Sequence, residues 1–263
     1  MHRSVQVHLE VDITRQALLA FQIAIATHVG QQQLLASVDG QPVFLREIAA
    51  PHDGRMHLLD AEPGMLIVDY TAQLEGRLLT APGSEHDPLL YRRPSRYCPS
   101  DRFLALEAAE FGHITEPGDA VNAVADWVQR RLTYSSGSSG PTDDAVDSLL
   151  LGEGVCRDYA HVVISMLRAR DIPARLAAVY APGLSPMDFH AVAEAWVDGS
   201  WRVVDATGLA PRGSMLRIAT GRDASDTAFL SVHDGSAELV AIEVTAVVDE
   251  LPVDRGHVPA TLS

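Results

Sequence analysis

A cysteine stands at the start of a stretch with strong helical periodicity. Cys156 follows the segment Leu151–Val155, in which Gly152 and Gly154 interrupt regular structure. From Cys156 onward, apolar residues recur at the spacing of one helix face, at Ala160, Val163, Ile164 and Leu167. A thiol at a helix N-terminus lies near unbonded backbone N–H groups and the positive end of the helix dipole, and both favour the nucleophilic thiolate. Cys156 is therefore a candidate nucleophile, and a small buried core residue is the alternative interpretation.

A histidine and an aspartate lie on the two different strands of a predicted β-hairpin. Asp198 and Gly199 form a strong two-residue turn signal between two stretches typical of strands. If these two residues are the loop, Asp205 lies opposite Val192 and diagonal to His190 on the same face. Side chains can bridge the ~7–8 Å between diagonal neighbours. A longer loop or a bulge would change this register.

Together these three residues have the types that covalent acyl transfer needs. Asp205 would orient one ring nitrogen of His190, and His190 would activate Cys156 and later protonate the leaving amine. Taken singly, His190 could be a half-exposed strand histidine and Asp205 a strand-end residue bonded to its own turn. The combination predicts a catalytic triad of Cys156, His190 and Asp205.

Other reactive side chains have simpler interpretations. Cys98 stands in a segment rich in Pro, Ser and Arg, and we expect a structural thiol. Arg157 and Asp158 follow the nucleophile directly, where they could form an ion pair at the helix start or line the cleft. Tyr134 is a weaker candidate for a hydrogen-bond donor to an oxyanion.

No metal or cofactor site is expected. The sequence has eleven histidines but neither Cys-x-x-Cys nor His-Glu-x-x-His spacing. His161 is five positions after Cys156 and off its face of the helix. No carboxylate-dense calcium loop occurs, and the Gly-Ser-Ser-Gly run lacks the lysine of a phosphate-binding loop.

The first part of the chain, residues 1–95, has the pattern of a β domain. Ser4–Asp12 alternates apolar and polar residues, which is typical of a half-buried strand. Shorter candidate strands follow, separated by Gly, Pro, Asp and His: Leu18–Ala26, Leu34–Val38, Pro42–Ile48, Met56–Leu59 and Met65–Leu74. We predict an antiparallel β-sandwich.

A second domain is predicted over residues 96–263, after a proline-containing boundary at Tyr91–Ser100. Helices are expected from Asp101 to Glu110, after Asp119, after Asp143 or Asp144, and from Cys156 to about Arg170, and Ser135–Gly140 should be a flexible loop. The candidate strands are Ala174–Tyr180, His190–Val197, Trp201–Asp205 and Glu238–Val248. Helices followed by an antiparallel sheet indicate an α+β domain.

Two stretches resemble a known family. GEGVCRDYAHVVISMLRARDIPARLAAVYAPG is similar to the nucleophile segment of the transglutaminase-like superfamily, in the bacterial branch described as "putative cysteine proteases", and DFHAVAEAWVDGSWRVVDAT is similar to its histidine hairpin. The resemblance implies a papain-like α+β domain, with the nucleophile helix packed on an antiparallel sheet, preceded by a β domain. It also implies Cys156 as nucleophile, His190 as base and Asp205 as its orienting partner. The chain departs from the pattern with Asp171 in place of Gly and Val192 in place of Trp.

Composition limits the classes of partner. The chain has 263 residues with 20 basic and 35 acidic side chains, for a formal charge of −15. This charge disfavours nucleic acid and anionic membrane surfaces. The N-terminal segment has no apolar core or cleavage site of a signal peptide, and no apolar run approaches the ~20 residues that span a bilayer. With two cysteines as free thiols, we expect a cytoplasmic protein.

The sequence thus predicts a cysteine enzyme that acts on peptide or amide bonds through a thioester. On the resemblance, hydrolysis by a protease or amidase is preferred. A protein-glutamine transglutaminase and a non-catalytic peptide-binding module are the alternatives. The substrate and the oligomeric state stay open.

Overall fold

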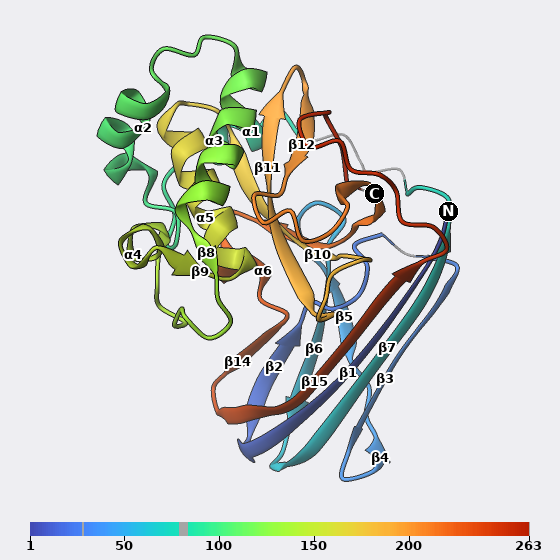
Figure 1. Cartoon of the computed structure of the whole chain (residues 1–263). Helices are drawn as coiled ribbons and strands as arrows, with labels where there is room; N and C mark the ends of the chain where they lie inside the picture. The colour runs from blue at the N-terminus through green and yellow to red at the C-terminus, as the bar shows by residue number, and fades with distance from the viewer. Residues whose placement is uncertain (28, 79–83, 263) are drawn as a thin grey trace.

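Two antiparallel sheets form a β-sandwich at one end of the molecule (Figure 1). The computed structural model describes residues 1–27, 29–78 and 84–262. One sheet has the order β15 (Ser236–Val248), β1 (His2–Arg15), β7 (Gly64–Glu75), β3 (Gln31–Val38) and β4 (Gln41–Pro42). The other has the order β14 (Leu230–His233), β2 (Ala17–Phe21), β6 (Arg55–Ala61) and β5 (Arg46–Ala49).

The alternation predicted for the first strand is confirmed. Val5, Val7, Leu9 and Val11 of β1 are at most 3% exposed and form the core between the sheets with residues such as Tyr70 of β7. The intervening residues face outward, as period-two patterning requires. Burial of one apolar face per sheet therefore holds the sandwich together.

Several shorter strands differ from their predicted limits. The segment expected as Leu18–Ala26 leaves the sheet after Phe21. The backbone N–H of Ile25 donates to the Tyr70 hydroxyl at 3.1 Å, and that of Ala26 to the Arg217 carbonyl at 2.9 Å. Residues after Phe21 thus bond to other parts of the fold instead of continuing the strand.

The last two strands of the chain, β14 and β15, belong to the sandwich and not to the second sheet. We predicted residues 96–263 as one domain, but β14 pairs with β2 and β15 pairs with β1 along nearly its whole length. Pairing with β1 covers an edge that would otherwise expose unpaired backbone groups. The chain therefore returns to complete the sandwich, which a sequence-local pattern does not reveal.

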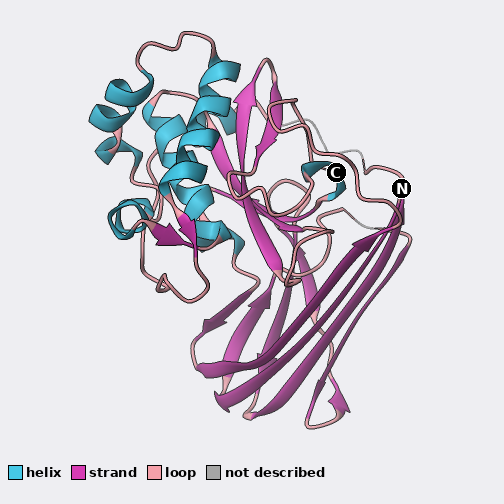
Figure 2. Ribbon diagram, in the orientation of Figure 1, coloured by secondary structure: helices cyan, strands magenta, loops and turns pink. Residues whose placement is uncertain are grey.

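The second part of the molecule is α+β, as predicted. Its sheet has the order β12 (Ser200–Val204), β11 (Phe189–Val197), β10 (Ala174–Tyr180) and β13 (Leu216–Gly221). The helices are α1 (Asp87–Leu90), α2 (Leu104–Phe111), α3 (Pro117–Arg131), α4 (Ala145–Leu151), α5 (Cys156–Ala169) and α6 (Ala224–Thr227). Helices α2 to α5 gather on one side of this sheet (Figure 2). Short 3-10 turns cover Ser100–Arg102 and Arg212–Ser214.

Helix α5 is buried on all sides rather than on the one face that periodicity predicted. It contacts β10 and β11 on one side and α3, α4 and the Ser100–Arg102 turn on the other. Its polar side chains are buried with partners, as in Arg168, which donates to the carbonyls of Ala174 and Arg222 at 2.8 and 2.6 Å. A polar side chain can be buried at a small cost in free energy when it is hydrogen-bonded. The polar side chains of α5 are therefore compatible with burial on all sides of the helix.

Helix limits follow local chemistry. Asp144 caps α4 with both hydrogen bonds of a capping box. Asp144 was one of the two residues, with Asp143, predicted to begin this helix. Helix α3 begins at Pro117, before the predicted Asp119, because proline suits the first helical turn. Asp171, where the resemblance leads us to expect Gly, has a φ of 61° just past α5. No helix among the described residues has the length and apolarity needed to cross a membrane.

Candidate active site

The start of α5 holds Cys156 at a partly exposed position. Val155 is the extended N-cap residue, and two short strands precede and flank it, β8 (Thr133–Tyr134) and β9 (Glu153–Gly154). The two strands pair in parallel, with Tyr134 opposite Gly154. Cys156 is thereby fixed at the helix N-terminus predicted from periodicity, where the first backbone N–H groups of a helix have no partner within the helix.

The predicted hairpin register is confirmed. Val197 pairs with Ser200 and Ala193 with Val204, so Asp198 and Gly199 alone form the loop. Both have positive φ, 51° and 75°, as a type I′ turn requires. This register carries the chain after β12 back to the level of His190.

His190 and Asp205 are hydrogen-bonded in the interior. Nε2 of His190 lies 3.1 Å from Oδ2 of Asp205, and the two side chains are 0% and 2% exposed. The other oxygen of Asp205 accepts from the backbone N–H and the hydroxyl of Thr207 at 2.8 and 2.7 Å. The turn after β12 thus holds the carboxylate in one orientation.

The surroundings of His190 favour its charged form. Burial by itself lowers the pKa of His190, but the hydrogen bond to Asp205 and the electrostatic interactions with Asp205 and the nearby Cys156 thiol outweigh burial and raise the pKa to about 10. Burial raises the pKa of Asp205, while the bonds from His190 and Thr207 and the charge of His190 bring it below its ordinary value. The pair is therefore an imidazolium and a carboxylate at neutral pH.

The second ring nitrogen of His190 is the one left for the thiol. Nδ1 is buried and has no hydrogen-bond partner among the described residues. The Cys156 thiol is nevertheless close enough to contribute to the raised pKa of His190. The structure thus brings together all three residues that the sequence predicted.

Tyr134 lies beside the nucleophile. Partial burial and the electrostatic interaction with the neighbouring Cys156 raise the pKa of Tyr134 to about 12, and its hydroxyl also interacts with the Cys156 backbone. The phenol is therefore protonated at neutral pH and can donate a hydrogen bond next to the thiol. The sequence offered only a weak indication of this residue, because β8 and β9 are too short to recognise from their pattern.

Arg157 and Asp158 tie the Ser/Gly loop to the start of α5. Asp158 accepts from the N–H of Val155 at 2.8 Å and from the Ser139 hydroxyl at 2.6 Å. Arg157 donates to Ser139 at 3.1 Å and to the Gly140 carbonyl at 2.9 Å, and pairs with Asp158 at 3.2 Å. The segment predicted as a flexible loop is thus bonded to the two residues that follow the nucleophile.

Other candidates from the sequence lie in the core. Cys98 is 0% exposed, and burial raises the pKa of its thiol to about 12 despite the nearby Arg168. His161 is also 0% exposed, stacks on Tyr97, and accepts from the backbone N–H of Ala224 at 3.2 Å. Within the described ranges, no group of three His, Cys, Asp or Glu side chains has the arrangement of a metal site.

Two sizeable cavities of the molecule lie away from the thiol. A cavity of about 1250 Å³ lies between the sandwich and the second sheet, and none of its lining residues belongs to the Cys156, His190 and Asp205 group. A second cavity, of about 520 Å³, borders Asp205 from behind but does not reach Cys156. The candidate active site is therefore identified from its three side chains, because the volume of a cavity does not by itself indicate reactive groups.

Similarity to known proteins agrees with this geometry. Residues 107–206 match the sequence model of the transglutaminase-like superfamily. A crystal structure from Cytophaga hutchinsonii, described as a "Putative Cysteine Protease", is 31% identical in sequence and has a TM-score of 0.85. The match covers 96% of this chain and 92% of the Cytophaga chain. The uncharacterized protein ML0607 of Mycobacterium leprae is 28% identical over 169 residues, 58% of this chain. The match spans 59% of that relative's length.

The chain belongs to the transglutaminase-like superfamily. Its architecture is the one that the resemblance implied, a β-sandwich followed by an α+β part with the cysteine helix on an antiparallel sheet.

Proposed function

We propose that this protein is a cysteine-nucleophile acyl-transfer enzyme that hydrolyses peptide or amide bonds through a thioester. Cys156 is the nucleophile, His190 the acid and base, and Asp205 the residue that orients and charges the imidazole. The single observation that carries the proposal is the His190 ring, which is bonded to Asp205 through Nε2, keeps a buried Nδ1 without a partner among the described residues, and has its pKa raised by the neighbouring Cys156 thiol. Serving one partner with each nitrogen is the arrangement that a nucleophile–base–carboxylate triad requires.

Acylation uses the imidazolium as acid. The Cys156 thiolate attacks the carbonyl carbon, forming a C–S bond and placing the carbonyl electron pair on an oxyanion. The oxyanion collapses, the C–N bond breaks, and His190 gives its proton to the departing amine. The Tyr134 hydroxyl and the N–H groups at the start of α5 supply donors for the oxyanion.

Deacylation uses the neutral imidazole as base. His190 takes a proton from water, and the resulting hydroxide equivalent attacks the thioester carbon. Collapse breaks the C–S bond, releases the carboxylic acid, and restores the thiolate and imidazolium. An amine in place of water would give transamidation with the same residues.

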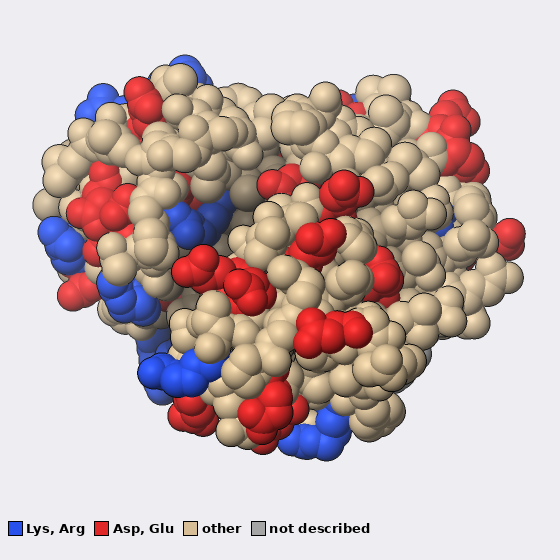
Figure 3. Space-filling model, turned by 90° about the horizontal axis from the view of Figure 1, so that it is seen from below, with Lys and Arg blue, Asp and Glu red and all other residues tan. Residues whose placement is uncertain are grey.

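Charge supports a peptide or protein substrate over a polyanion. The face seen from below is hollowed and carries many acidic side chains (Figure 3). Together with the formal charge of −15, this repels nucleic acid. Cationic or neutral peptide segments meet no such repulsion.

Thiol labelling and substitution test the proposal. Iodoacetamide should label Cys156 much faster than the buried Cys98, whose raised pKa of about 12 keeps it neutral. Cys156→Ala should abolish turnover of a peptide library, while Cys98→Ala, the matched control, should keep it. In wild type, mass spectrometry should find an acyl adduct on Cys156, and products made in H₂¹⁸O should carry the heavy oxygen. Equal labelling of both thiols, or full turnover by Cys156→Ala, would contradict the proposal.

A further inference from the structure

An acidic side chain lies next to the candidate triad without taking part in it. Asp188 precedes His190 by two residues, just before β11 begins at Phe189. Two residues of extended chain span about 7 Å, so the backbone of Asp188 lies close to the base of the triad. A charge at this position is therefore within reach of a substrate bound at the thiol.

The packing of Phe189 sets the direction of the side chains on either side of it. Its ring stacks on Phe229 at a centroid distance of 4.9 Å and contacts Tyr180 at 5.7 Å, against the core of the sandwich. Successive side chains of an extended chain point to opposite sides, so Asp188 and His190 point away from the side that Phe189 occupies. His190 is buried there, whereas Asp188 is exposed.

Electrostatic interactions connect Asp188 to two elements of the candidate site. Partial burial of the carboxylate raises the pKa of Asp188, and the hydrogen bond from Phe189 and the charge of His190 oppose this rise. Burial and the neighbouring Cys156 raise the pKa of Tyr134 to about 12, and the charge of Asp188 adds to this rise. Tyr134 and His190 stand on different elements, β8 and β11, so Asp188 lies near both groups that interact with the thiol.

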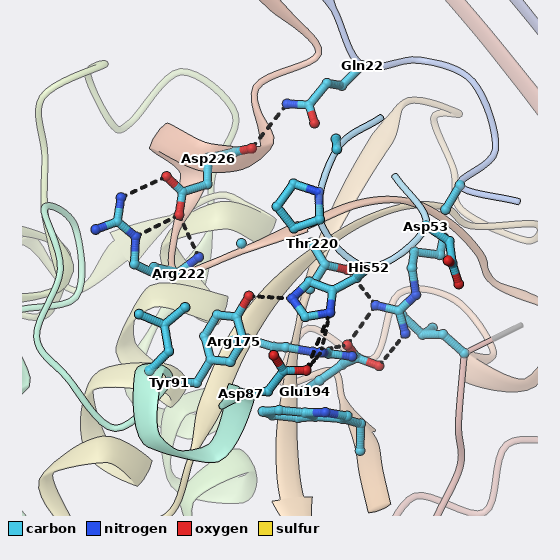
Figure 4. A pocket seen from close by; sticks show the side chains of 18 of the residues that line it. Gln22, His52, Asp53, Asp87, Tyr91, Arg175, Glu194, Thr220, Arg222 and Asp226 are labelled. Carbon is cyan, nitrogen blue, oxygen red and sulfur yellow. Dashed lines mark hydrogen bonds and ion pairs between the residues drawn. The ribbon is translucent and has the colours of Figure 1, made fainter. Parts of the chain in front are cut away.

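The carboxylate of Asp188 has no cationic partner among the described residues. Its one hydrogen bond there comes from the backbone N–H of Phe189 at 2.7 Å. In the large cavity between the sandwich and the second sheet, by contrast, Glu194 accepts from Arg175 at 2.8 Å and Asp226 from Arg222 at 2.9 Å (Figure 4). An ionised carboxylate has ~four acceptor positions, so Asp188 can still receive a cation.

The cation that follows the nucleophile in the chain is already engaged. Arg157 pairs with Asp158 at 3.2 Å. It also donates to the Ser139 hydroxyl at 3.1 Å and to the Gly140 carbonyl at 2.9 Å. A Lys or Arg side chain of a substrate would therefore find Asp188 without a competing partner, and the formal charge of −15 favours the approach of cationic peptides.

We propose that Asp188 determines the substrate preference of this site, by pairing with a Lys or Arg side chain that flanks the scissile bond. This inference rests on the proposed hydrolysis, since it names the class of peptide that Cys156 would cleave. A neutral residue at that position would leave the carboxylate without a cation, and an acidic one would be repelled.

Matched peptides test the proposal. In a peptide that wild type cleaves, the residue on each side of the scissile bond is replaced in turn by Lys, Gln and Glu, and kcat/KM is measured. At one of the two positions Lys should exceed Gln about tenfold, because charges attract only moderately at a partly exposed position. Asp188→Asn keeps an acceptor for the Phe189 N–H and should bring this ratio close to one, and Asp188→Lys should reverse the preference in favour of Glu.

Asp198→Asn is the matched control, because it makes the same change at the exposed turn at the other end of the hairpin. It should keep the wild-type ratio. A merely structural role of Asp188 would lower kcat/KM for all peptides alike, so an unchanged ratio of Lys to Gln in Asp188→Asn would overturn the proposal. A wild-type ratio near one at both positions would also overturn it, while leaving the hydrolysis intact.

Charged thiol reagents separate failure of this inference from failure of the proposed function. The Cys156 thiolate attacks a methanethiosulfonate, an S–S bond forms, and methanesulfinate leaves. The ratio of the rates with a cationic and an anionic methanethiosulfonate should fall about tenfold in Asp188→Asn, whether or not the protein cleaves a peptide. If wild type cleaves no peptide while this ratio falls, the hydrolysis is wrong and cation recognition by Asp188 is supported. Equal ratios in the two proteins would overturn the role of Asp188.

Discussion

Replacement of Asp205 by Asn tests the electrostatic role of the carboxylate most directly. The substitution keeps the shape and leaves an oxygen that can accept from Thr207, whose two donors lie at 2.7 and 2.8 Å. It removes the negative charge that lies 3.1 Å from His190 in the interior. The ring therefore loses its counter-charge while the packing changes little.

The magnitude follows from the pKa of His190. An ordinary value of 6.5 and a value of about 10 in the fold correspond to roughly 5 kcal/mol in favour of the imidazolium. The hydrogen bond to Asp205 is the largest contribution that raises this pKa, and the interaction with the Cys156 thiol comes next. In Asp205→Asn the pKa should fall, the thiolate should lose its cationic partner, and turnover should drop ~10³–10⁴-fold.

The same pKa gives a pH dependence of stability. A raised pKa in the fold stabilises the protein fully below the unfolded-state value of 6.5, and this contribution is lost as pH rises through about 10. Wild type should therefore lose unfolding free energy between these two values, by at most roughly 5 kcal/mol. Asp205→Asn should lose clearly less over the same range.

Two measurements check this prediction. Urea unfolding as a function of pH gives the free energy, and the rate of Cys156 alkylation as a function of pH reports the thiolate. Asp198→Asn, on the exposed turn of the same hairpin, is the control and should behave as wild type, because asparagine also accepts its positive φ of 51°. Identical alkylation profiles in wild type and Asp205→Asn would refute the reasoning.

Three further substitutions have defined outcomes. Tyr134→Phe removes the hydroxyl beside Cys156 and should lower kcat ~100-fold with little change in KM; an unchanged kcat would exclude it as an oxyanion donor. Asp158→Asn breaks the charge-assisted bond with Arg157, so denaturant titration should find a loss of about 2 kcal/mol, and a neutral effect would argue against the tie. Asp171→Gly relieves a φ of 61° and should add about 0.5–1 kcal/mol; a lower melting temperature would contradict this.

Local patterns were sufficient where the structure depends on near neighbours. The start of α5, the capping aspartate of α4 and the strand Ala174–Tyr180 all agree with their predicted positions. The turn at Asp198 and Gly199 fixed the register of the hairpin, since only a two-residue loop with positive φ fits there. Helix periodicity and turn chemistry act over a few residues, so they can be read from the sequence.

Long-range pairing was not accessible in this way. Nothing local in β15 indicates that it lies beside β1, more than two hundred residues earlier. Periodicity identified one apolar face of α5, but partners from distant segments also bury its polar residues, as Arg222 does for Arg168. The position of Tyr134 depends on two strands of two residues each.

The sequence by itself determined the chemistry on offer: a thiol at a helix start, and an imidazole and a carboxylate held on one face by a tight turn. Only the tertiary structure decided that the helix start and the hairpin meet, and that the sandwich and the sheet enclose a separate polar cavity. The physical reason is that such contacts arise from burial of surfaces far apart in the chain. Their free energy depends on the whole core and not on any one segment.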